Sequence, residues 1–125
     1  MITKRPINLN PLSIRLPLSA WVSITHRLSG LLIFILMPLL LWALDMSLGT
    51  EAGYLDLVDA MSQPWLRGLL FVFVGGLLFH LIAGVRHLLM DMQVGESLKV
   101  SRMSAGAVVI IAAIFILYAL YLIWG

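Results

Sequence analysis

The chain contains no cysteine and few charged residues. The absence of cysteine excludes disulfide bonds, iron–sulfur clusters held by thiolates, and covalent haem attachment through a Cys-x-x-Cys-His motif. Charged residues make up 11% of the 125 residues, whereas soluble domains carry roughly 25%. Hydrophobic residues make up 62%, and the mean hydropathy is +1.05. These values indicate an integral membrane protein built as one bundle, and the net charge of +2 is too small to indicate a nucleic-acid partner.

Three long runs of the sequence contain no acidic or basic residue apart from one histidine. The runs are Leu28–Leu44, Gly68–Val85 and Met103–Gly125. A helix needs about 17–25 apolar residues to cross the hydrocarbon core of a bilayer. Because backbone groups in lipid must hydrogen-bond within their own segment, each run predicts a membrane-spanning helix. We expect these helices to cover residues 19–45, 65–90 and 103–125.

The basic residues are distributed unequally between the two ends of these spans. Seven of the eight precede the first span or flank the turn between the second and third: Lys4, Arg5, Arg15, Arg27, Arg86, Lys99 and Arg102. Arg67 lies on the other side, together with Asp45, Glu51, Asp56 and Asp59. Because basic loops remain in the cytoplasm, segments 1–18 and 91–102 should be cytoplasmic. A loop over 46–64 and the C-terminus should then be periplasmic.

Segment 1–18 is polar and too rich in proline and asparagine for the start of an ordinary cleavable signal peptide. The first span is therefore expected to act as an uncleaved signal anchor. Prolines favour an extended backbone in residues 5–11. We expect this stretch on the cytoplasmic surface, either in contact with a soluble partner or as a solvated tail.

His80 lies inside the second span, where an ionisable side chain is costly and usually has a partner and a task. Imidazole most often ligates a metal or transfers protons. Gly76 and Gly84 lie one helical turn before and after it, so this face is expected to have room for a flat, large group. The pattern favours a non-covalent b-type haem with His80 as axial ligand, the second ligand coming from another chain or from His26. The alternative is a histidine that holds helices together by a hydrogen bond.

Two further polar clusters lie at the cytoplasmic ends of the first two spans. Arg86 and His87 follow the second run, where arginine either pairs with haem propionates or anchors the helix at the interface. Ser23 and Arg27 share a helix face at i, i+4. They are suited to hydrogen-bond a quinone carbonyl, with His26 moving protons. From these residues alone, a serine-rich helix start followed by an interfacial arginine is the favoured interpretation.

Two motifs make the chain similar to a known family. They are Arg5-Pro6-Ile7-Asn8-Leu9 leading into Ser23-Ile24-Thr25-His26-Arg27-Leu28-Ser29-Gly30, and His80-Leu81-Ile82-Ala83-Gly84-Val85-Arg86-His87-Leu88-Leu89-Met90-Asp91. With the three spans, they resemble the cytochrome b membrane-anchor subunit (C subunit) of succinate dehydrogenase, or respiratory complex II, over essentially the whole chain. Gln93 stands where the family often has a small residue, which affects the expected loop conformation.

The resemblance implies an all-α membrane protein whose three transmembrane helices belong to a heteromeric helix bundle that binds haem b. His80 matches the axial haem ligand, and the second anchor subunit donates the other axial ligand. His26, Arg27 and His87 match positions near the haem propionates, and Arg86 is assigned to the same vicinity from its place at the interface.

Ser23 and Arg27 match the ubiquinone pocket of the family, and we include their neighbour Ile24 in that pocket. The implied function is that of a membrane anchor in succinate:quinone oxidoreductase, which passes electrons from succinate to ubiquinone; this subunit carries no catalytic residue of its own. The implied partners are the second anchor subunit (D subunit), the iron–sulfur subunit and the flavoprotein subunit. The expected location is the inner membrane of a bacterium, with multiple passes.

Two alternatives remain open at this stage. One is the anchor of a fumarate reductase that uses menaquinone, because nothing in the sequence fixes the direction of electron flow. The other is a non-redox membrane scaffold or small transporter subunit. No acidic residue lies within a span, which counts against a transporter.

Overall fold

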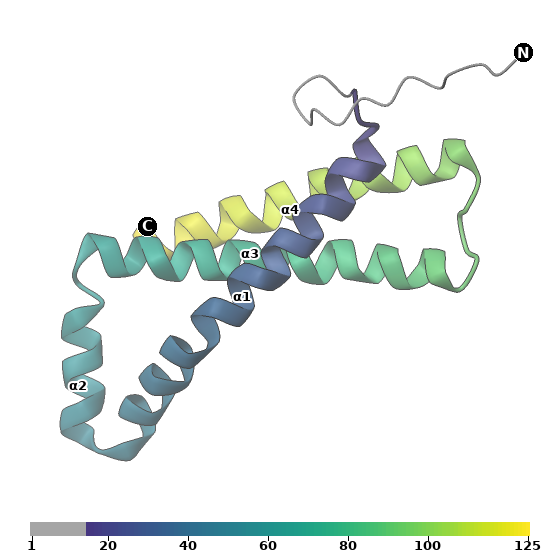
Figure 1. The fold of residues 1–125 in the computed structure, drawn as a ribbon. Coiled ribbons are helices and arrows are strands. Elements are labelled where there is room, and N and C mark those ends of the chain that lie inside the picture. The colour runs from purple at the N-terminus through teal and green to yellow at the C-terminus, as the bar shows by residue number, and fades with distance from the viewer. Residues whose placement is uncertain (1–14) are drawn as a thin grey trace, which may run out of the picture.

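The computed structural model describes residues 15–125, and within them the backbone forms four α-helices and no strand (Figure 1). The helices are α1 (Leu18–Gly49), α2 (Glu51–Ala60), α3 (Pro64–Asp91) and α4 (Leu98–Trp124). Helices α1, α3 and α4 have 32, 28 and 27 residues and are apolar enough to cross a membrane. The prediction of an all-α protein with three transmembrane helices is thus confirmed.

Helix α2 occupies most of the segment 46–64 that was expected to be a loop. Helix α1 continues to Gly49, and α2 begins directly after Thr50. The Thr50 hydroxyl accepts a hydrogen bond from the Gly53 backbone N–H at 3.0 Å and so caps the new helix. Glu51 places a negative charge in the first turn, which also favours a helix start. The connection between the first two spans is therefore largely helical, which the sequence analysis did not predict.

Helices α3 and α4 lie side by side in opposite directions and are joined by a turn (Figure 1). The turn is shorter than the expected loop over 91–102, because Ser97 accepts a hydrogen bond from the Val100 N–H at 3.3 Å and starts α4 at Leu98. Gln93 has a φ of 62° in this turn, a conformation that favours glycine. The departure from the family pattern at Gln93 therefore coincides with a left-handed backbone.

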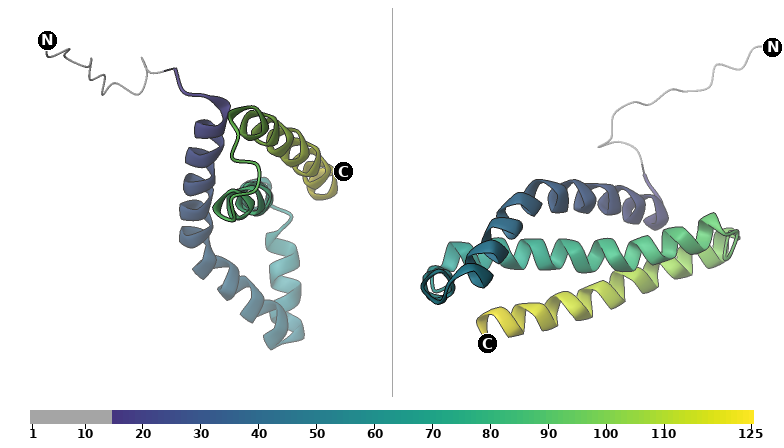
Figure 2. Two further views of the ribbon diagram at one scale, coloured as in Figure 1. Left: turned by 90° about the vertical axis from the view of Figure 1, so that its right-hand side faces the viewer. Right: turned by 90° about the horizontal axis from the view of Figure 1, so that it is seen from below.

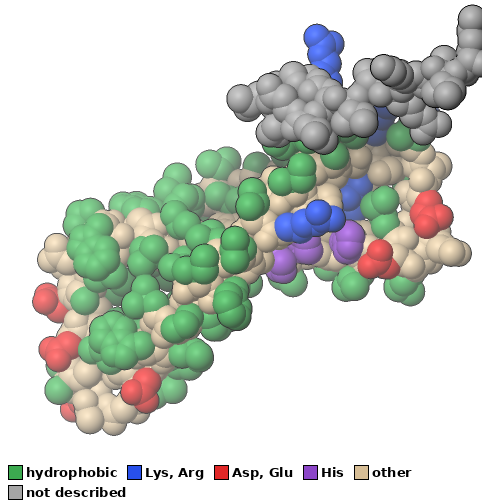
Figure 3. Space-filling view, viewed as in Figure 1, with side chains coloured by type: hydrophobic (Ala, Val, Ile, Leu, Met, Phe, Trp, Pro, Cys, Tyr) green, Lys and Arg blue, Asp and Glu red, His purple; other side chains and the backbone are tan. Residues whose placement is uncertain are grey.

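Small side chains form the contact between the three long helices. The buried apolar cluster consists of Val22 on α1, Ala83 on α3, and Ala105 and Val108 on α4. Small residues let membrane helices approach closely. Large hydrophobic side chains cover the outer surface instead (Figure 3), as expected for helices that face lipid or other apolar helices.

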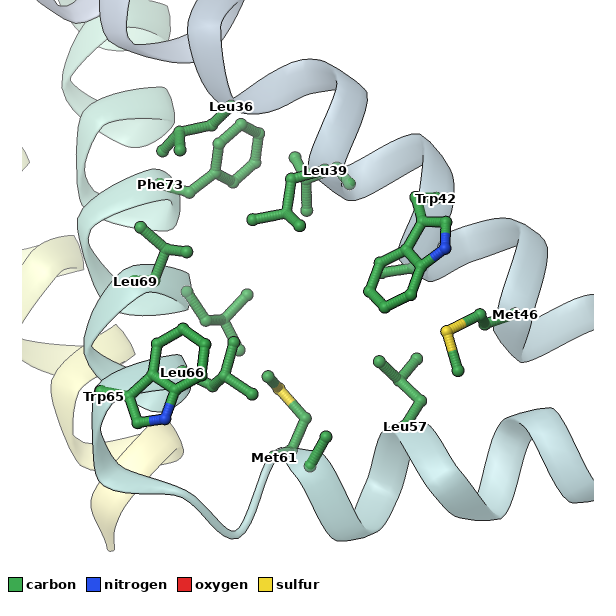
Figure 4. Close-up of a pocket in the computed structure, with 14 residues that line it drawn as sticks. Leu36, Leu39, Trp42, Met46, Leu57, Met61, Trp65, Leu66, Leu69 and Phe73 are labelled. Carbon is green, nitrogen blue, oxygen red and sulfur yellow. The ribbon is translucent and has the colours of Figure 1, made fainter.

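Helix α1 crosses α3 and bends, so that its second half runs away from α3 (Figure 2). Pro38 lies inside this helix, and a proline commonly bends a helix because it lacks a backbone N–H and crowds the preceding turn. The diverging half of α1, helix α2 and the start of α3 enclose an apolar cavity of about 390 Å³ (Figure 4). The cavity is lined by residues such as Leu39, Trp42, Leu57 and Trp65.

Candidate functional site

His80 on α3 reaches across to α1, where two acceptors meet its Nδ1 atom. Nδ1 lies 3.0 Å from the backbone carbonyl oxygen of His26 and 3.1 Å from Ser29 Oγ. A carbonyl oxygen only accepts hydrogen bonds, so Nδ1 must carry the proton and donate it. In the neutral imidazole, Nε2 is then unprotonated. This is the state in which a histidine nitrogen ligates a metal.

Glycines allow α1 and α3 to come close at this point. A Cβ atom on Gly30 would lie 2.9 Å from His80 Cε1, and a Cβ atom on Gly84 would lie 3.2 Å from His26 Nε2. Each histidine therefore occupies the space that a glycine leaves on the opposite helix. A Cβ atom on Gly76 would lie 3.1 Å from a methyl group of Leu32.

This packing corrects one expectation from the sequence. Gly76 and Gly84 were expected to leave room on α3 for a flat, large group. Side chains of α1 fill both positions instead, Leu32 at Gly76 and His26 at Gly84. The glycines of α3 therefore serve the contact between two helices of this chain, and a group bound by His80 must reach it from another side. His80 remains only partly buried.

The three histidines lie together although they come from two helices. The rings of His26 and His80 stack with centroids 4.1 Å apart and planes 9° apart. The rings of His26 and His87 lie 5.9 Å apart, so His26 stands between the other two. His87 Nε2 also lies 3.8 Å from Asp91 Oδ2, in an exposed and loose pair. Figure 3 shows the histidine side chains gathered on one face, with basic side chains beside them.

A pocket of about 400 Å³ lies next to this cluster, between the start of α1, the end of α3 and the start of α4; we call it the polar pocket because most of the residues that line it are polar. Ser23 lines it together with Arg86 and His87, which were predicted for the site, and with Ser19, Asp91 and Ser101, which were not. Ile24 and Arg27 are exposed and are not among its lining residues. The structure thus brings one of the three predicted quinone residues into the pocket.

Arg86 is 8% exposed and points toward α4. Its Nε donates to Ser104 Oγ at 3.0 Å, and its Nη2 lies 3.2 Å from both the carbonyl oxygen and the hydroxyl of Ser101. These bonds join α3 to α4 at the polar pocket, which Arg86 and Ser101 both line. Ser101 and Ser104 were not predicted for the site. The available signal is a pair of serines three residues apart at the start of a helix, opposite the arginine near the end of the preceding helix.

The fold and the histidine cluster define a multi-pass helical membrane protein with imidazole and guanidinium groups near one end of its spans. Residues 1–120 match the model of the family described as succinate dehydrogenase/fumarate reductase transmembrane subunit. The chain belongs to this family. The resemblance to a cytochrome b anchor subunit of succinate dehydrogenase is thereby confirmed.

Individual relatives agree with this assignment. The succinate dehydrogenase cytochrome b556 subunit of Coxiella burnetii (strain RSA 493 / Nine Mile phase I) is 34% identical over 125 residues, which cover 99% of this chain and 100% of that protein. The proteins of the same name from Rickettsia bellii (strain RML369-C) and Rickettsia prowazekii (strain Madrid E) are 28% and 29% identical. Their matches cover 90% and 86% of this chain, and 87% and 83% of those proteins. The Arg5–Leu9 motif lies outside the described residues.

Proposed function

We propose that this chain is a haem-bearing membrane anchor of succinate:quinone oxidoreductase and that His80 is one axial ligand of a b-type haem. The hydrogen bond from His80 Nδ1 to the His26 carbonyl oxygen carries this proposal, since it leaves Nε2 for the iron. Metal-ligating histidines almost always donate their other N–H to a carbonyl, a carboxylate or water. The relatives are named cytochrome b556 subunits, which supports a b-type haem. When bound, such a haem accepts and returns one electron.

Basic and imidazole groups near His80 are suited to hold the haem propionates. Arg27 is exposed on α1, and the rings of His26 and His87 lie next to each other. We assign these three residues to the propionates. Arg86 has less support in this role, because its Nε and Nη2 already bind serines on α4.

We place the quinone at the start of α1, where Ser23 lines the polar pocket and Ile24 and Arg27 lie on the exposed side. In this assignment, the Ser23 hydroxyl and the Arg27 guanidinium donate hydrogen bonds to quinone oxygens, while Ile24 contacts the ring. The site lies at the end of the span that the basic residues predict to be cytoplasmic. A quinone diffusing in the bilayer reaches this boundary directly.

The remaining steps fall to the partner subunits. In such a complex, succinate would be oxidised in the flavoprotein subunit, electrons would pass through the iron–sulfur subunit, and the second anchor subunit would help to hold the haem and complete the ubiquinone pocket. The family also includes fumarate reductase subunits. The relatives carry the name succinate dehydrogenase, and this favours the direction from succinate to quinone in a bacterial inner membrane.

A spectrum of the purified complex tests the haem assignment. We expect the intact complex to give a b-type α-band on reduction, and His80→Ala to abolish it. Leu81→Ala is the matched control, because Leu81 is the next residue on α3 and is 62% exposed. A His80→Ala complex that contains all subunits and retains the normal band would disprove the assignment.

A further inference from the structure

Ser29 is a buried polar residue in the middle of α1 and belongs to none of the sites assigned so far. It is 7% exposed. Its hydroxyl lies 2.7 Å from the His26 carbonyl oxygen and 3.1 Å from His80 Nδ1. The first contact joins two residues of one helix, while the second joins α1 to α3.

The direction of each hydrogen bond at Ser29 follows from the chemistry of the groups. The His26 carbonyl oxygen only accepts, so the single hydroxyl proton of Ser29 is donated to it. The Ser29 oxygen therefore accepts from His80 Nδ1–H, which also faces the carbonyl. One imidazole N–H is thus shared by two acceptors on α1, and those acceptors are themselves joined.

A serine inside a helix often bonds only to a carbonyl of the preceding turn. Ser47 does so in the same helix, where its hydroxyl donates to the Leu44 carbonyl at 2.8 Å in an exposed position. Ser29 differs because it is buried and its oxygen has a second partner on another helix. Gly30, the next residue, allows the His80 ring to come this close.

We propose that Ser29 is a positioning residue for the haem ligand, in that its hydroxyl, together with the His26 carbonyl, fixes the tautomer and ring orientation of His80. This inference rests on the proposed role of His80. Hydrogen bonding to the distal N–H of a ligating histidine orients the ring and strengthens the other nitrogen as a donor. A stronger donor stabilises ferric iron. The Ser29 hydroxyl therefore lowers the midpoint potential of the haem and slows its loss.

The test uses the intact complex with Ser29→Ala. We expect the haem midpoint potential to rise, and haem transfer to a scavenging apoprotein to become about 10-fold faster, at the low end for lost partners of metal-ligating histidines. Ser29→Thr keeps a hydroxyl and should behave as wild type. Ser47→Ala removes a hydroxyl with the same type of helical bond and should change neither quantity.

The outcomes separate this inference from the proposed function. If His80→Ala keeps the b-type band, both are overturned. If His80→Ala loses the band while Ser29→Ala retains the wild-type potential and haem-loss rate, the ligand assignment stands and the role of Ser29 is refuted. Ser29→Cys, whose sulfur is a weak acceptor, should give a smaller shift in the same direction. The cysteine variant tests the positioning role of Ser29 if the alanine variant does not assemble into the complex.

Discussion

Adding a single methyl group at Gly30 should destabilise the chain, although alanine favours a helix more than glycine does. Replacing glycine by alanine inside a helix contributes about 0.5–1 kcal/mol of stability. Inserting an extra carbon into a packed site costs about 1–3 kcal/mol. The new Cβ would lie 2.9 Å from Cε1 of His80, and that ring is held by two acceptors on α1. We expect a net loss of about 1.2 kcal/mol, the difference between the midpoints of these two ranges.

Two glycines on α3 allow a comparison with Gly30 of α1, because an added Cβ atom would have progressively more room at them. At Gly84, the added Cβ would lie 3.2 Å from His26 Nε2, which is tight but less so. At this position, the gain from the helix preference of alanine and the steric cost of the added carbon should nearly cancel. At Gly68, no atom lies within 4 Å, so alanine should stabilise the chain by about 0.5–1 kcal/mol. The expected order of stability is Gly68→Ala, then Gly84→Ala, then Gly30→Ala.

The assay is unfolding of the full chain in mixed micelles by increasing amounts of sodium dodecyl sulfate, followed by circular dichroism. The midpoint should rise above wild type for Gly68→Ala and fall below it for Gly30→Ala. If Gly30→Ala proved as stable as Gly68→Ala, the His80 ring would be free to move aside. The close approach of α1 and α3 at the histidines would then not be a constraint.

Three further predictions concern other parts of the molecule. Arg86→Ala removes three hydrogen bonds to α4. At about 0.6 kcal/mol for each bond between membrane helices, the detergent titration should show a loss of about 2 kcal/mol in stability. An unchanged midpoint would contradict the role of Arg86 in joining α3 to α4. Arg27→Ala should lower the rate of quinone reduction by the complex about 10-fold or more, as for a lost hydrogen bond to a charged group. The rate of succinate oxidation with an artificial acceptor should stay unchanged. If the variant and the wild type reduced quinone at the same rate, Arg27 would not belong to the quinone site. Thr50→Ala should cost about 1 kcal/mol of helix stability and speed amide hydrogen exchange in α2 but not in α3. If the substitution left the exchange rates of α2 unchanged, the Thr50 hydroxyl would not stabilise this helix as a cap.

The transmembrane helices could be predicted because uncharged runs of sufficient length have few structural alternatives in lipid. Helix α2 was missed because it is ten residues long and its start depends on one hydroxyl, that of Thr50. A short helix in a connection leaves no long apolar run. The sequence therefore predicts where the chain crosses the membrane better than how the crossings are joined.

The candidate site was predictable in its residue types but not in its contacts. A glycine on a helix face has the same sequence pattern whether a ligand or another helix fills the gap, so Gly84 was interpreted wrongly. An arginine at a helix end can face solvent, a ligand or a neighbouring helix, and only the packing of α3 against α4 directs Arg86 to Ser101. The contact between Ser29 and His80 likewise depends on the register between α1 and α3.

Because α1 bends, α1 and α3 touch at one end of the molecule and diverge at the other. The two helices touch where His80 meets Gly30, whereas beyond Leu36 and Phe73 the apolar cavity separates them (Figure 4). At the diverging end, α2 connects α1 to α3, and the cavity lies between the three helices. Changes in bilayer thickness tilt membrane helices, and we expect such tilting to displace the half of α1 beyond Pro38 more than the half that packs on His80. The arrangement of the histidines should then depend little on the thickness of the membrane.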